Sequence, residues 1–206
     1  MRIDSERPTV CRDEDDGGEM KKIMIIILLV SATADLFAQS RWLIRNYNDE
    51  FGDPTETEYI SHQRVSGVFA NVATTGAHLK VEMSVSNQAQ NLYRTAGFED
   101  ILISFKFYEY AGRHPVKTTS TEDFTVLIKT KSGERIKFSA VQYSTNIYLK
   151  PMESKRLSKL LLDGGTIKMN FRDSAMAGLG SSYLFEINGD GYSEVYYKYF
   201  KVSKPK

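Results

Sequence analysis

The stretch Ile101-Leu-Ile-Ser-Phe-Lys-Phe-Tyr-Glu-Tyr110 decides the fold class of this chain. Its large apolar side chains recur at every second position, and successive side chains of an extended strand point to opposite faces. This period of two predicts a long, half-buried β-strand rather than a helix. One face of that strand then carries Ile101, Ile103, Phe105, Phe107 and Glu109.

The same alternation recurs on both sides of this stretch and predicts a chain of short strands. The turn signal Ser132-Gly133 lies between two of them and is typical of a β-hairpin. With 101–110, the expected strands number nine. The others are expected at 42–44, 65–70, 79–85, 124–129, 135–140, 147–149, 166–171 and 183–187.

Two short helices interrupt this pattern. Between Pro151 and Leu162 the apolar residues recur at helical spacing, Pro suits the first turn, and Gly164-Gly165 follows as a stop. A second helix is expected after Ser193, which we expect to cap it. Strands without regular strand–helix alternation predict an all-β fold, either an antiparallel two-sheet sandwich, which we prefer, or a partly closed barrel.

Residues 20–38 have the layout of a secretory signal peptide. Two lysines precede an eight-residue apolar run, and small residues follow it, so we expect cleavage after Ala34 or Ala38. The run is too short for a transmembrane span, which needs ~20 apolar residues. The acidic residues 1–19 cannot bury a core, and we interpret them as an extension ahead of a start at Met20, or as a disordered arm. The predicted location is periplasmic or secreted.

The expected mature chain, 39–206, is long enough for a single β-rich domain with a substantial core. It has no cysteine, because Cys11 lies ahead of the leader, so disulfides and thiolate chemistry are excluded. It holds 22 basic and 18 acidic residues, a net charge of +4. That excess is too small to indicate nucleic-acid binding.

The acidic stretch Asn48–Glu58 is the candidate metal site. Asp49, Glu50 and Asp53 offer the oxygen ligands that calcium prefers, although their spacing differs from that of an EF-hand. The alternative is a solvated loop whose turn at Pro54 is held by Asp53. Calcium is the one cofactor considered.

No complete catalytic set is visible in the sequence. Glu109, between two tyrosines, and an acid of the 49–58 loop are the only carboxylate pair that a glycan hydrolase could use. Glu82 belongs to the polar face of its strand and is expected to be exposed to solvent. His62, His78 and His114 lack the spacing of a zinc site.

Trp42 and the loop Asp49-Glu-Phe-Gly-Asp-Pro-Thr55 resemble a family of exported bacterial proteins that has no assigned activity. The likeness extends to Gly67-x-Phe69-x-Asn71, Tyr108-Glu-Tyr110, Gly164-Gly165-x-Ile167 and Gly191-Tyr192. More loosely, the order of elements is similar to that of periplasmic sandwich proteins of the invasion-associated and type VI secretion accessory kinds. The resemblance implies export and a β-rich fold.

We therefore expect an exported, non-catalytic binding or accessory domain whose partner is an envelope protein or a glycan. A glycan-directed hydrolase and a calcium-dependent adhesion domain remain as alternatives.

Overall fold

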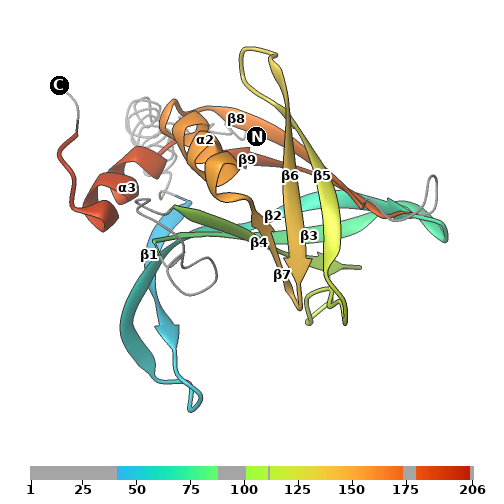
Figure 1. Ribbon diagram of the computed structural model, residues 1–206, viewed down its shortest axis with the longest axis horizontal. Helices are drawn as coiled ribbons and strands as arrows, with labels where there is room; N and C mark the ends of the chain where they lie inside the picture. Colours follow the sequence, from blue (N-terminus) through green and yellow to red (C-terminus); the bar gives the residue numbers. More distant parts are fainter. Residues whose placement is uncertain (1–40, 88–100, 111, 174–179, 205–206) are drawn as a thin grey trace, which may run out of the picture. The chain divides into compact units, whose positions relative to one another are not determined.

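The computed structural model describes residues 41–87, 101–110, 112–173 and 180–204. These belong to one compact unit, Ser40–Lys206. The predicted leader and the acidic segment ahead of it lie outside the described residues. Figure 1 shows a strongly twisted β-sheet with two short helices gathered at one end.

All nine predicted strands are present, and every pair of neighbours is antiparallel. The hydrogen-bonded order is β1-β2-β3-β4-β7-β6-β5-β8-β9, and β9 also pairs with β2. The strands are β1 Trp42–Asn48, β2 Pro54–Asn71, β3 Thr74–Ser86, β4 Leu102–Glu109, β5 Glu122–Lys129, β6 Arg135–Tyr143, β7 Asn146–Leu149, β8 Thr166–Asp173 and β9 Ser182–Asn188.

The pairing of β2 with β9 joins eight strands into a closed barrel and leaves β1 as an extra strand. The predicted all-β class is confirmed, and of the two architectures the barrel is correct rather than the preferred sandwich. The physical reason is the length of β2, which has 18 residues and so can pair with two strands, β1 and β9, along the same edge. Its first half pairs with β1, and its second half, from Gly67 to Ala70, pairs with β9.

The barrel interior is filled by side chains, mostly aromatic ones. Phe105 and Phe107 of β4 meet Phe171 of β8 with ring centroids 4.9 and 5.2 Å apart, and Phe185 of β9 stacks on Phe171 at 5.7 Å. All four rings are buried. Because each buried ring contributes ~1.5–3 kcal/mol, this cluster stabilises the closed sheet and leaves it packed rather than hollow.

Both predicted helices are present, as α2 Pro151–Leu162 and α3 Tyr192–Phe200. Leu157 and Leu161 of α2 are buried against the barrel, whereas Met152 is 68% exposed. The predicted cap of α3 is wrong, because the helix begins one residue earlier than Ser193 and follows Gly191, whose φ of 82° favours glycine.

Trp42 anchors the start of β1 at the end of the barrel that carries the helices. Its indole Nε1 donates to the carbonyl oxygen of Asn188 at 2.9 Å. Its ring lies edge-on to the ring of His62, with centroids 4.5 Å apart, and contacts Tyr192 of α3 at 4.7 Å. All three rings are buried. The contacts tie β1, β2 and α3 together.

His62 makes the stability of this end dependent on pH. Burial lowers the pKa of His62 below its ordinary value, against the opposing effect of the Gln63 carbonyl, which lies 2.6 Å from Nδ1. In the unfolded chain the imidazole has its ordinary pKa of ~6.5. Below that pH the unfolded state binds the proton more readily than the folded state, so acid reduces the free energy of unfolding.

We predict that the free energy of unfolding falls as the pH drops below about 6.5, and that His62→Gln removes this part of the pH dependence. Chemical denaturation between pH 5 and pH 8 measures the effect. The control is His78→Gln, because His78 is exposed. An unchanged pH profile in His62→Gln would show that another group is responsible.

Candidate functional site

A polar hollow of about 600 Å³ lies on the outside of the barrel, where β1 and β2 face β3, β4 and β7. We call it the tyrosine groove. Strand alternation creates it, because the residues between the buried ones on β3 and β4 must point away from the packed interior. Its principal side chains are Arg45, Tyr47, Tyr59, Arg64, Glu82, Ser84, Ser104, Lys106 and Tyr148.

Arg64 and Glu82 form one wall of the tyrosine groove, and Tyr108 contacts both of them from outside the lining. Arg64 Nε donates to Glu82 Oε1 at 2.5 Å, and the Tyr108 hydroxyl donates to Glu82 Oε2 at 2.6 Å. The Arg64 guanidinium also lies 4.4 Å above the centroid of the Tyr108 ring. Both oxygens of Glu82 are therefore engaged. Glu82, which was expected to be exposed to solvent, is partly covered by Tyr108 and Arg64, and its side chain is 34% exposed.

This cluster of three side chains keeps Glu82 ionised. Burial alone would raise the pKa of Glu82, but the hydrogen bonds from Tyr108 and Arg64 outweigh it and lower that pKa. Burial, together with the neighbouring carboxylate, raises the pKa of Tyr108 to about 12. Glu82 is thus an anion rather than a proton donor near neutral pH.

Tyrosine rings supply the apolar surface of the groove. Tyr47 and Tyr59 come from the paired strands β1 and β2, and their ring centroids are 4.5 Å apart with planes inclined at 37°. Burial raises the pKa of Tyr47, so its phenol remains protonated at neutral pH. Tyr148 of β7 contributes a third ring to the lining.

Hydroxyl groups and cations complete the lining. Ser84 and Ser104, directly opposite each other on β3 and β4, share a hydrogen bond of 2.7 Å. Arg45 and Lys106 also line the groove, and within the described part of the chain neither forms an ion pair with an acid. The groove therefore offers aromatic faces beside hydrogen-bond donors, acceptors and positive charge.

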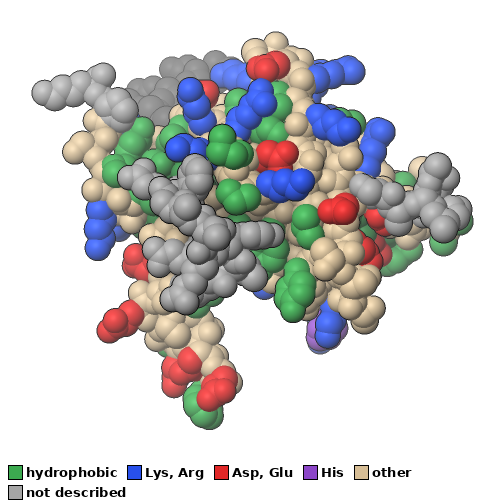
Figure 2. Space-filling view, in the orientation of Figure 1, with side chains coloured by type: hydrophobic (Ala, Val, Ile, Leu, Met, Phe, Trp, Pro, Cys, Tyr) green, Lys and Arg blue, Asp and Glu red, His purple; other side chains and the backbone are tan. Residues whose placement is uncertain are grey.

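The predicted calcium ligands lie elsewhere, at the tip of the β1–β2 hairpin. Figure 2 shows the acidic side chains of this hairpin projecting into solvent. Asp49 Oδ1 accepts from the backbone N–H groups of Phe51 and Asp53, each at 2.9 Å. Asp49, and not Asp53, therefore holds the turn. Across the described ranges no group of three or more His, Cys, Asp or Glu side chains is placed to bind a metal, so calcium binding by Asp49, Glu50 and Asp53 stays a prediction.

The candidate hydrolase pair, Glu109 and an acid of the 49–58 loop, is far apart along the sheet. Glu109 accepts from the Tyr183 hydroxyl at 2.8 Å and is opposite Leu79, which in turn is opposite Gly67. Glu58, the acid of the 49–58 loop nearest to Gly67 along β2, is nine positions away, roughly 30 Å of extended strand. Glycosidase carboxyl groups must lie within ~10 Å of each other. The structure does not bring this pair together.

Comparison with protein-family models, with curated proteins and with solved structures found no match. Among the described residues no helix is long and apolar enough to cross a membrane. The site therefore has to be interpreted from its own chemistry.

Sequence reasoning missed the tyrosine groove because its residues are spread over five strands. One signal was available: polar and aromatic side chains alternate with the core residues of β3 and β4, at Glu82, Ser84, Ser104 and Tyr108. The register that places Ser84 opposite Ser104 comes from the pairing of β3 with β4 and cannot be derived from either strand alone.

We predict that Glu82→Gln lowers the free energy of unfolding by about 1 kcal/mol, a value reduced by the partial exposure of the pair. The variant leaves the half-covered Arg64 guanidinium without its counterion. Urea denaturation measures the change. The matched control is Glu186→Gln, which breaks the exposed Lys168–Glu186 pair at 2.9 Å and should cost less than about 0.5 kcal/mol. Equal losses in the two variants would contradict the role given to the cluster.

Proposed function

We propose that the chain is an exported, non-catalytic binding domain of the cell envelope that holds a glycan in the tyrosine groove. The leader at residues 20–38 supports a periplasmic or secreted location. The observation that carries the proposal is the placement of the Tyr47–Tyr59 pair beside the hydroxyl and charged side chains of β3 and β4.

Glycan chemistry matches this lining. The C–H faces of a sugar ring pack on aromatic rings, and its hydroxyl groups both donate and accept hydrogen bonds. The Ser84–Ser104 pair and the ionised Glu82 offer acceptors, while Arg45 and Lys106 offer donors and can also meet an acidic substituent on the sugar. A concave site with a few converging polar groups is the usual form of a ligand site.

The arrangement of acids supports binding rather than hydrolysis. Glu82 is held ionised by two donors, and Glu109 and the acidic hairpin lie at separate places on β4 and β2. A groove that binds a sugar without a paired acid and base holds its ligand unchanged.

We predict that the exported chain co-sediments with purified peptidoglycan sacculi, and that Tyr47→Ala or Tyr59→Ala weakens binding about five- to tenfold. Loss of one aromatic contact is worth ~1–1.5 kcal/mol. The control is Tyr143→Ala, because Tyr143 is 64% exposed and lies outside the groove. Absence of sedimentation, or an equal loss in Tyr143→Ala, would overturn the proposal.

A further inference from the structure

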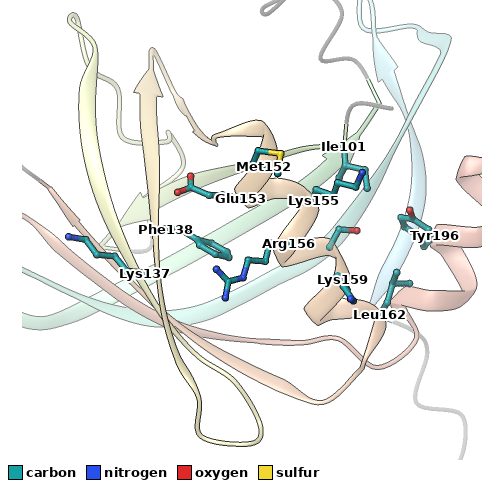
Figure 3. Close-up of a pocket in the computed structure, with 11 residues that line it drawn as sticks. Ile101, Lys137, Phe138, Met152, Glu153, Lys155, Arg156, Lys159, Leu162 and Tyr196 are labelled. Carbon is teal, nitrogen blue, oxygen red and sulfur yellow. The ribbon is translucent and has the colours of Figure 1, made fainter. Parts of the chain in front are cut away.

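A second hollow, of about 580 Å³, lies over α2 and is bounded by β6 and α3. We call it the α2 groove. Figure 3 shows its cationic side chains, which come from both the strand and the helix, and Tyr196 of α3 on the opposite side. Phe138 and Ile101 form the apolar base, and Met152 stands 68% exposed beside them. The cations are Lys137, Lys155, Arg156 and Lys159.

These four cations are not neutralised by the protein. None of them forms an ion pair with an acid among the residues that the structure describes. Glu153 is the one acidic side chain among the described lining residues, and its Oε1 accepts from the backbone N–H of Ser139 at 2.9 Å, so its carboxylate offsets only one of the four positive charges. Its Oε2 is buried. The groove is therefore positive, with an apolar base.

Repulsion between these positive charges lowers the stability of the domain when no partner is bound. Lys155 and Lys159 are four residues apart on one face of α2, a spacing at which like charges repel. Arg156 gains only a long cation–π contact with Phe138, at 5.7 Å from the ring centroid. An anionic partner would relieve the repulsion, since positive and negative surfaces on two proteins attract each other.

The spacing of the cations indicates the form of that partner. Lys155 and Lys159 are separated by ~6 Å along the helix axis, and alternate side chains of an extended chain are ~6.6–6.8 Å apart. We propose that the α2 groove docks an extended, acidic segment of a partner protein, whose carboxylates at alternate positions meet Lys155 and Lys159.

A protein segment fits this site better than a membrane surface. The ~6 Å spacing of Lys155 and Lys159 along the helix axis matches the spacing of alternate side chains in an extended chain, and the cations come from both β6 and α2. A narrow extended chain can enter the hollow and reach cations from both the strand and the helix.

The test measures binding of the exported chain to a fluorescein-labelled peptide, (Glu-Val-Glu-Thr)₃, by fluorescence anisotropy in 50 mM salt. The matched probe is the same peptide with Lys in place of Glu. We expect binding of the acidic peptide only, and weakening as the salt concentration rises. The double variant Lys155→Glu/Lys159→Glu should bind at least about tenfold more weakly, and Lys155→Gln/Lys159→Gln should fall between it and the unaltered chain.

The control variant is Lys117→Glu/Lys129→Glu, which makes the same charge change at two exposed lysines outside the groove and should bind as the unaltered chain does. Thermal melting checks that every variant folds. Equal binding of both peptides, no binding of the acidic one, or an equal loss in the control variant would overturn the proposal. So would binding to vesicles of phosphatidylglycerol, sensitive to Lys155 and Lys159, in the absence of peptide binding.

Discussion

The close approach of β2 to β9 at Gly67 is the constraint on which the rest of the structure depends. A Cβ atom added to Gly67 would lie 2.5 Å from the carbonyl oxygen of Leu184 and 2.8 Å from the Cβ of Phe185. Only glycine allows the two backbones to come this near without displacement. Closure at this point pairs the free edge of β9 with β2, leaves β1 as the edge strand, and brings Phe185 into contact with the rings of β4 and β8.

The tyrosine groove is a consequence of the same closure. Because β9 occupies the second half of the β2 edge, β1 can pair only with the first half, where Trp42 lies opposite His62 and bonds to the last residue of β9. The β1–β2 hairpin therefore extends away from the barrel, as Figure 1 shows. Tyr47 and Tyr59 then stand beside the outward-facing residues of β3 and β4 instead of joining the core.

The sequence was sufficient to predict the strands and helices but not the closure of the strands into a barrel. Period-two alternation located all nine strands, and Pro151 with Gly164-Gly165 bounded α2 correctly, because these are local effects. The barrel was missed as the preferred architecture because β2 and β9 are more than a hundred residues apart, and nothing local shows that they pair. The tyrosine groove could not be predicted for the same reason, because it depends on the pairing of distant strands. The acidic hairpin could be identified from its composition, but composition does not show which residues lie opposite one another.

Three small residues sit at structural joints. Gly67 closes the barrel, Asn71 Oδ1 accepts from two backbone N–H groups of the β2–β3 turn, and Asp190 joins the loop before α3 to Gly165 at 2.7 Å.

The most direct measurement of closure is a cysteine pair at Val68 and Leu184, which are register partners across β2 and β9. Residues 39–206 contain no other cysteine. We expect Val68→Cys/Leu184→Cys to form an intramolecular disulfide on mild oxidation, and the displaced pair Val68→Cys/Glu186→Cys to stay reduced. A folded Val68→Cys/Leu184→Cys protein that stays reduced under the same conditions would contradict the closed barrel.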